Sequence, residues 1–405
     1  MKIINIGARE ILNSGATTSL EVKIILEDGT EERASVPFGA SAGTYEAFVL
    51  FDGNKRYGGK GMLKAVSNVN TEIKDALIGQ NAYNQAEIDK IVIDLDGTEN
   101  KHRLGANAIL GVSLAVARAA AKSQKIELYE WIRRMSNIKI QTSNPMPDGR
   151  QEIQNPNVKL PLPMIVMIEG GKHADQSTDF QEYLIVPQIS ESAAENIRCG
   201  AEVYLALKSI LKEKGYNTNV GNEGAFAPAG IKSNEEPWEL ILEAIEKAGY
   251  KAGSPASLAG KDVMLAADPA CNEIAIVNQI QNPKSQIPNK SKIQNLKFQY
   301  YLKKENRILT SLELIDYFAK WVDKYPFISL EDILAEDDWA SWSQATQKLG
   351  QKVRIIGDDL LVTNQQRLKR AISEKSCNGI LIKLNQIGTL TETVKTIEMA
   401  HNAGF

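Results

Sequence analysis

Short apolar runs alternate with helical segments along the chain after residue 160. Each run has the length of a strand, and some of the helical segments carry caps, such as Thr389 three residues before Glu392. Repeated strand–helix units are typical of a parallel sheet, and this many units favours a barrel. The runs are 163–168, 183–186, 218–220, 263–267, 327–330, 353–356 and 379–382. The sequence therefore predicts an α/β fold with a TIM-like barrel.

A charged side chain follows each of several of these runs. The carboxyl ends of parallel barrel strands open on one face, where the chemistry of such folds is found. Any one of these residues could simply be a solvent-exposed charge, because polar residues often end strands. That interpretation is poor for a charged residue after several successive runs. We therefore expect these side chains to converge: Glu223, Asp268, Glu331, Asp358 and Lys383.

The chemistry of this set fits proton abstraction next to a substrate carboxylate. Asp268, Glu331 and Asp358 can supply three carboxylate oxygens to Mg²⁺, and their mutual repulsion would be costly without a cation. A lysine near such a cation has its neutral form favoured, so Lys383 can act as a base. Glu223 can donate a proton to a leaving group.

The first part of the chain has a different pattern. Strand-like segments at 21–26 and 32–37 flank a turn signal, which predicts a hairpin, and helical patterning dominates from about residue 60 to 131. We expect an α+β domain over residues 1–135 and a polar linker over 136–160. The incomplete barrel domain then covers 161–405, with a low-complexity insertion at 276–297.

The composition of the chain further narrows the range of possible functions. A net charge of −3 gives no reason to expect nucleic-acid or membrane partners, and no secretory signal or transmembrane span is evident. The three cysteines form no CxxC pair, as expected for thiols in a reducing cytoplasm. With only three histidines, a His-rich zinc site is disfavoured, and a carboxylate site for Mg²⁺ is favoured. We expect a cytoplasmic protein.

A succession of motifs resembles the enolase family over essentially the whole chain. They include Ala8-Arg-Glu-Ile-Leu, Val36-Pro-Phe-Gly-Ala-Ser-Ala-Gly, Leu104-Gly-Ala-Asn-Ala-Ile-Leu-Gly, Gly170-Gly-Lys-His, Gly221-Asn-Glu-Gly-Ala-Phe-Ala-Pro, Ser329-Leu-Glu-Asp, Gly357-Asp-Asp-Leu-Leu-Val-Thr-Asn and Ile382-Lys-Leu-Asn-Gln-Ile-Gly-Thr. One such motif would be weak evidence, but many motifs in the same order make the resemblance strong. It implies the phosphopyruvate hydratase reaction of glycolysis, the reversible dehydration of 2-phosphoglycerate to phosphoenolpyruvate, in a homodimer.

The resemblance also implies roles for single residues. By similarity, Lys383 removes the C2 proton, Glu223 assists departure of the C3 hydroxyl, and Ser41 belongs to a loop that closes over a second Mg²⁺. The structural Mg²⁺ would be held by Asp268, Glu331 and Asp358. The substrate side would include His173, Gln181 and Glu182. On pattern alone, His173 and Ser41 are equally interpretable as loop residues, and Gln181 and Glu182 as residues that cap a strand.

Several departures from the family pattern bear on activity. Asn222 and Ala225 flank Glu223 where the family usually has Asp and Gly, and Ala225 adds a methyl where a glycine with positive φ is expected. Glu169 replaces a usual Asn. The chain stops at Phe405, where the family continues into an eighth strand and a second active-site lysine. We therefore expect a barrel without its last strand and, if residue 405 is the true terminus, very weak or absent dehydratase activity.

Two alternatives remain open from the sequence. The chain can be a catalytically impaired enolase-like paralogue or fragment that acts only by binding or dimerising. Asn222 and the missing terminal strand favour this alternative, whereas Lys383 and the four carboxylates oppose it. Another acid–base enzyme of the enolase superfamily is disfavoured, because the loop around Ser41 matches enolase itself.

Overall fold

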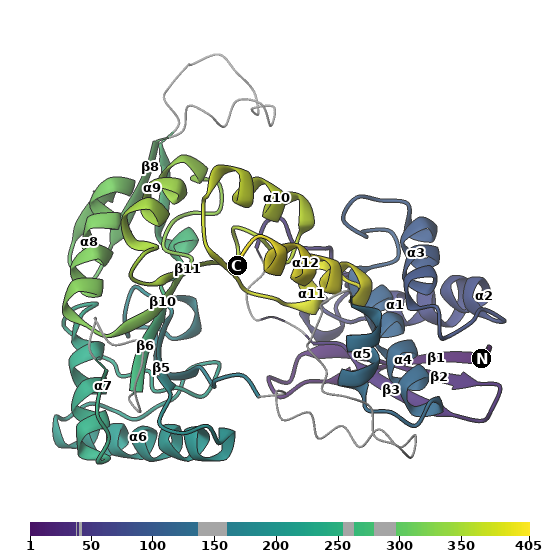
Figure 1. Ribbon diagram of the computed structural model, residues 1–405, viewed down its shortest axis with the longest axis horizontal. Helices are drawn as coiled ribbons and strands as arrows, with labels where there is room; N and C mark the ends of the chain where they lie inside the picture. Colours follow the sequence, from purple (N-terminus) through teal and green to yellow (C-terminus); the bar gives the residue numbers. More distant parts are fainter. Residues whose placement is uncertain (38, 40–42, 137–159, 254–262, 279–296) are drawn as a thin grey trace, which may run out of the picture. The chain divides into compact units, whose positions relative to one another are not determined.

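The computed structural model describes residues 1–405 except 38, 40–42, 137–159, 254–262 and 279–296 (Figure 1). The chain divides into two compact units. The first contains Met1–Ile138, Leu361–Ala371 and Ile380–Phe405, and the second contains Lys139–Leu360 and Ile372–Gly379. The predicted linker and most of the predicted 276–297 insertion lie outside the described residues. The domain boundaries at 135 and 161 stay predictions.

The first unit contains an antiparallel sheet of β1 (Ile3–Leu12), β2 (Thr18–Leu26) and β3 (Glu31–Ser35). The predicted hairpin is present as the β2–β3 pair, in register at Val22 and Ala34. Alternate residues of β2 are fully buried, from Leu20 through Val22 and Ile24 to Leu26. This period of two gives the sheet one apolar face.

Helix α4 (Ala106–Ser123) packs against β2 and β3. Its small residues permit a close approach: a Cβ atom on Gly111 would lie 2.6 Å from Val22 Cγ2 and 2.9 Å from Leu20 Cδ1. The other helical segments of this unit include η1 (Arg56–Gly59), α1 (Leu63–Asn68), η2 (Val69–Ile73), α2 (Lys74–Leu77), α3 (Gln85–Asp96), α5 (Leu128–Met135), α11 (Leu384–Ile387) and α12 (Leu390–Asn402). The sheet and these helices confirm the predicted α+β class of the N-terminal part.

Buried polar contacts dock α12 onto the helices of the same unit. Thr389 caps the helix by accepting the Glu392 N–H at 3.2 Å, as the spacing of these residues predicts. N–H groups in the first turn of the helix, which have no partner within the helix, donate to side chains of other helices. Leu390 donates to Ser113 Oγ at 3.0 Å, and Thr391 donates to Asp89 Oδ2 at 2.9 Å. The carboxyl-terminal segment is thus held by the N-terminal part of the chain.

An ion pair near the end of β1 links it to the segment before α1. Glu10, whose side chain is only 12% exposed, accepts from Arg56 Nη2 at 2.6 Å and from the Met62 N–H at 2.7 Å. The hydrogen bond from Arg56 is the main cause that holds the pKa of Glu10 below its ordinary value. The charged form of Glu10 therefore stabilises this unit.

We expect Arg56→Met to lower the free energy of unfolding by about 1 kcal/mol at neutral pH. Because the pKa of Glu10 is depressed in the folded state, this stability is present above the ordinary glutamate pKa and is lost as the pH falls through the folded value. The difference between variant and wild type should shrink as the pH falls below the ordinary glutamate pKa, and it should close once Glu10 is protonated in the folded state. Urea unfolding at several pH values measures it, with Lys55→Met, at the exposed position next to Arg56, as a control that should change little. A difference that persists at low pH would contradict the assignment to Glu10.

The second unit contains a sheet with the order β12-β11-β10-β6-β5-β4. The strands are β4 (Ile165–Glu169), β5 (Glu182–Pro187), β6 (Val263–Asp268), β10 (Phe327–Glu331), β11 (Arg354–Gly357) and β12 (Gly379–Ile380). Strands β6, β10 and β11 run parallel, whereas β5 is antiparallel to both β4 and β6. The α/β class is confirmed, and the sheet is open rather than closed into a barrel.

Two details of the predicted parallel sheet are wrong. The connection from β4 to β5 contains only the short segment η3 (Gly171–His173) and no crossover helix, so the chain turns straight back and the pair is antiparallel. The run 218–220 is not a strand. The Asn217 side chain accepts the Asn219 N–H at 3.1 Å, which makes a local turn, and Val220 forms only an isolated bridge with Phe226.

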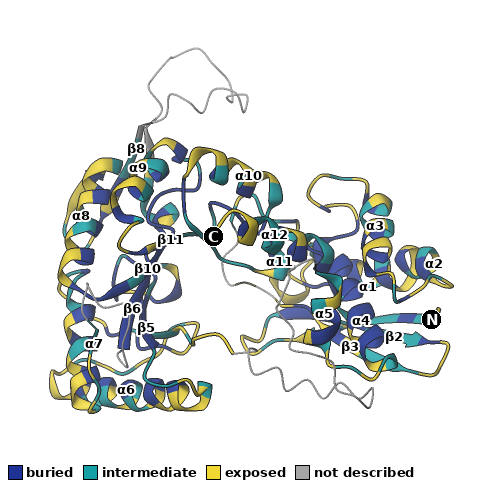
Figure 2. Cartoon of the chain, viewed as in Figure 1, coloured by how far each residue is buried: buried dark blue, intermediate teal, exposed yellow. Residues whose placement is uncertain are grey.

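Helices and a second small sheet complete this unit. Figure 2 shows that β5, β6 and β10 are buried, whereas α6 (Ala193–Glu213) and α7 (Glu236–Lys247) each have an exposed face. Trp238, Phe318 and Trp321 form part of an aromatic cluster in the core. The elements are α6 (Ala193–Glu213), α7 (Glu236–Lys247), η4 (Cys271–Ile274), β7 (Ala275–Asn278), β8 (Lys297–Leu302), β9 (Arg307–Thr310), α8 (Ser311–Lys324) and α9 (Trp339–Leu349); α10 (Gln365–Glu374) bridges the division.

Among the described residues, no helix carries an apolar stretch long enough to cross a bilayer.

Candidate active site

Carboxylates gather at one end of the second unit's sheet. Strands β4, β6 and β10 end on Glu169, Asp268 and Glu331, and the antiparallel β5 begins with Glu182. The register pairs Glu182 with both Glu169 and Asp268, so three acidic residues lie side by side on adjacent strands. Asp358 follows directly after β11. The strand ends thus bring together the carboxylates that the sequence singles out.

Glu331 lies at the centre of this group. It is buried, and burial raises its pKa well above the ordinary value, with further contributions from Asp268, Asp358, Asp332 and Glu182. A carboxylate surrounded by carboxylates is stable in its charged form only beside a cation. A buried donor set of carboxylate oxygens suits Mg²⁺ or another hard cation, and Asp268, Glu331 and Asp358 therefore fit the predicted metal ligands chemically.

Asp332 is a member of this group that the sequence interpretation missed. Its two carboxylate oxygens accept the N–H groups of Asp358 at 3.0 Å and Asp359 at 2.7 Å. Oxygens of these three aspartates lie within 4.8 Å of one another, close enough to share a cation. Asp332 thereby fixes the segment after β11 and orients Asp358. Its place directly after Glu331 was the only available signal.

His173, Glu182 and Glu223 form a second group in the same unit. His173 Nδ1 lies 3.6 Å from Glu182 Oε1 and 3.8 Å from Glu223 Oε1. The ring is buried, and neither ring nitrogen has a hydrogen-bond partner among the described residues. Gln181 Nε2 donates to Asp268 Oδ2 at 3.4 Å, which connects this group to the first. The structure thus brings the predicted substrate-side residues of this unit close to the predicted acid, Glu223.

Glu169 organises the loop that carries Glu223. Its carboxylate accepts the Glu223 N–H at 3.2 Å and the Ala225 N–H at 2.7 Å, and burial raises its pKa. A Cβ atom on Gly221 would lie 2.3 Å from Glu169 Oε2 and 2.8 Å from the backbone carbonyl oxygen of His173, so glycine is required there. No role for Glu169 could be predicted from the sequence, because its partners are backbone groups of a distant loop.

The expected strain at Ala225 is not found. Gly224 adopts the left-handed conformation in this loop, with φ of 91°, and Ala225 does not. The methyl group of Ala225 is therefore compatible with the loop, and the expectation that this position needs glycine was wrong.

Two predicted site residues remain, Lys383 and Ser41. Lys383 is exposed and belongs to the first unit; β12 ends at Ile380, two residues earlier than the predicted run. Ser41 lies outside the described residues. The roles of all these residues stay predictions.

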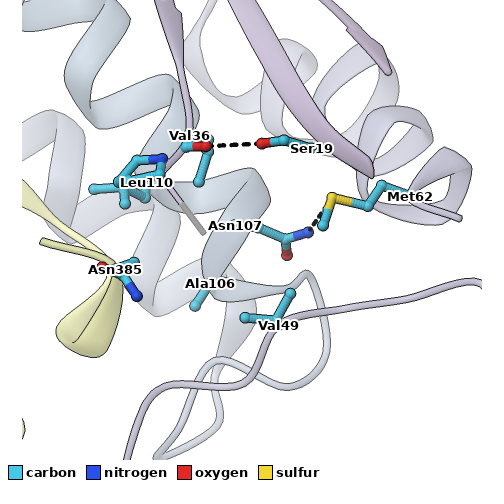
Figure 3. A pocket seen from close by; sticks show the side chains of 9 residues that line it. Ser19, Val36, Val49, Met62, Ala106, Asn107, Leu110 and Asn385 are labelled. Atoms are coloured by element: carbon cyan, nitrogen blue, oxygen red, sulfur yellow. Dashed lines mark hydrogen bonds between the residues drawn. The ribbon is translucent and has the colours of Figure 1, made fainter. Parts of the chain in front are cut away.

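A small cavity in the first unit is too small for a substrate. Its volume is about 10 Å³, which is room for one water molecule. Figure 3 shows Ser19, Val36, Asn107 and Met62 around it, with Ser19 Oγ donating to the Val36 carbonyl at 2.7 Å. This cavity is therefore not a candidate active site.

Comparison with known protein families gives two matches that together cover nearly all of the chain. The model of the enolase N-terminal domain matches residues 3–132. The model of the enolase C-terminal TIM barrel domain matches residues 157–405. The second match contains both acidic groups and Lys383. With its acidic strand ends and these two domains in order, the chain belongs to the enolase family, whose members are lyases of the enolase superfamily.

Proposed function

We propose that this protein is a Mg²⁺-dependent phosphopyruvate hydratase, which interconverts 2-phosphoglycerate and phosphoenolpyruvate in glycolysis. The observation that carries the proposal is the gathering of buried carboxylates around Glu331, next to His173 and Glu223, in a chain that matches both enolase domains. The family further supports a cytoplasmic homodimer.

In this proposal the two proton transfers belong to separate side chains. The Lys383 amine takes the C2 proton, and the electron pair of that C–H bond forms the C2–C3 double bond. The C3–O bond breaks, and Glu223 donates a proton so that the hydroxyl leaves as water. Glu223 suits this step because its side chain is 43% exposed and therefore open to a small molecule from solvent. His173, Gln181, Glu182 and Ser41 would bind the substrate.

Asp268, Glu331 and Asp358 would hold the metal. When bound, Mg²⁺ would neutralise the negative charge that develops on the substrate carboxylate after proton loss. The buried position of Glu331 keeps bulk water away from these charges, which strengthens their attraction for a cation.

An assay of the purified chain tests the proposal. We expect phosphoenolpyruvate to form from 2-phosphoglycerate in the presence of Mg²⁺, however slowly, measured at 240 nm, and EDTA to abolish the reaction. Exchange of the C2 proton with D₂O, followed by NMR, reports proton abstraction separately from loss of water. If the protein binds 2-phosphoglycerate and Mg²⁺ without proton exchange or turnover, the catalytic proposal fails and the non-catalytic alternative is favoured.

A further inference from the structure

Two adjacent residues of the first unit adopt a backbone conformation that side chains like theirs rarely tolerate. Val362 has φ of 42° and Thr363 has φ of 54°, and both are fully or almost fully buried. β-branched residues are strongly disfavoured in this left-handed region. Such strain persists only where the surroundings over-determine it, and it is concentrated at functional sites.

The Thr363 hydroxyl group both accepts and donates a hydrogen bond. It accepts the backbone N–H of Lys383 at 2.9 Å and donates to Gln386 Oε1 at 2.9 Å. The Thr363 carbonyl oxygen accepts from Thr396 Oγ1 at 3.0 Å. Thr363 is therefore fixed from both sides, and its side chain is placed directly against the backbone of Lys383.

Gln386 joins this contact to the N-terminal part of the same unit. Its Nε2 donates to Glu46 Oε1 at 3.4 Å, and its carbonyl oxygen accepts the Ala47 N–H at 2.8 Å. The Gln386 N–H donates back to the Lys383 carbonyl at 3.1 Å. The backbone of Lys383 is thus held on both sides: its N–H group by Thr363 and its carbonyl oxygen by Gln386.

A third contact braces the same region. The Arg367 guanidinium lies over the Tyr45 ring, 3.8 Å from its centroid. Tyr45 directly precedes Glu46, and Arg367 is four residues after Thr363. The attraction between the guanidinium and the ring holds these two segments together.

We propose that Thr363 is a positioning residue: its strained backbone aims its hydroxyl at the Lys383 N–H and so fixes the direction in which the Lys383 side chain leaves the backbone. The inference rests on the proposed function, in which Lys383 is the base. The backbone sets the direction of the Cα–Cβ bond, so a fixed backbone narrows the volume that the long side chain of Lys383 can reach. A displacement of about 1 Å can cost about 100-fold in rate, so this restriction matters for proton transfer.

Thr363→Val tests the proposal, because valine keeps the β-branch and the approximate shape and has a methyl group in place of the hydroxyl. Hydrogen–deuterium exchange of a peptide that covers residues 381–386 should show faster exchange at the Lys383 amide. The kcat for C2 proton exchange should fall about 10- to 100-fold, with KM changed less than about threefold. Thr363→Ser, which keeps the hydroxyl, should restore kcat to within about threefold of wild type.

Thr393→Val is the matched control. Thr393 is buried in the same unit, and its hydroxyl donates to the Thr389 carbonyl within α12 at 2.8 Å. It should lower stability without changing kcat or the exchange of the Lys383 amide. The proposal is overturned if Thr363→Val leaves the Lys383 amide protected, if it leaves kcat unchanged, or if Thr393→Val lowers kcat equally.

The two proposals fail in different ways. If the wild-type protein does not exchange the C2 proton, the proposed function fails, whatever the variants do. Amide exchange then still decides whether Thr363 fixes the Lys383 backbone, because that measurement needs no substrate. If the wild type exchanges the proton and Thr363→Val does so equally fast, the proposed function stands and the positioning role is overturned.

Discussion

Replacing Lys383 with alanine is expected to lower the rate of C2 proton exchange in 2-phosphoglycerate by about 1000-fold or more. A general base typically contributes about 10²- to 10⁴-fold, and alanine leaves no group that can take the proton. The rise in melting temperature on Mg²⁺ addition should persist, because this change leaves the predicted metal ligands Asp268, Glu331 and Asp358 in place. NMR-detected exchange in D₂O and thermal unfolding measure the two effects.

Two further lysine variants separate basicity from charge. Lys383→Arg keeps the positive charge, but guanidinium does not lose its proton at neutral pH, so this variant should be as inactive as the alanine variant. Lys395→Ala, at an exposed position of α12, should retain full activity. Substantial proton exchange in Lys383→Arg would show that Lys383 acts as a charge and that another group is the base.

The gathering of carboxylates was predictable because it follows from strand ends. Asp268 and Glu331 end buried strands, and the carboxyl ends of parallel strands meet at one edge. The same reasoning failed for 218–220, where the side chain of Asn217 competes with the sheet for a backbone N–H. Local side-chain hydrogen bonds of this kind leave no periodic pattern in the sequence from which they could be predicted.

The residues that support the site could not be predicted. Glu169 and Asp332 both act by accepting backbone N–H groups from loops that are distant in sequence. A single sequence does not show which loop will approach a given carboxylate. Thr363 is similar, because its role depends on a left-handed backbone that its residue type disfavours.

The second large effect is expected at the predicted metal site. We expect Mg²⁺ at about 100 times its Kd to stabilise the wild-type protein by about 2.7 kcal/mol, and its melting temperature to rise by about 5–10 °C. Glu331→Gln should abolish most of this rise, because it replaces the central buried carboxylate with an amide that is a poor ligand. Without Mg²⁺ the variant should be at least as stable as wild type, since one buried charge is removed from among its neighbours. Dehydration should fall about 100-fold or more.

The pH dependence of Mg²⁺ binding and a control variant show whether Glu331 is a metal ligand or has only a structural role. Because burial and neighbouring carboxylates raise the pKa of Glu331, protons compete with Mg²⁺, and wild-type affinity for Mg²⁺ should increase as the pH rises. Asp338→Asn is the matched control: Asp338 is also buried, with a raised pKa, but it accepts from Tyr300 and Ser311. This variant should lose stability and keep the full Mg²⁺-induced rise. If Glu331→Gln retains that rise, or if Asp338→Asn loses it, the metal is bound elsewhere, and the carboxylates at the strand ends serve another purpose.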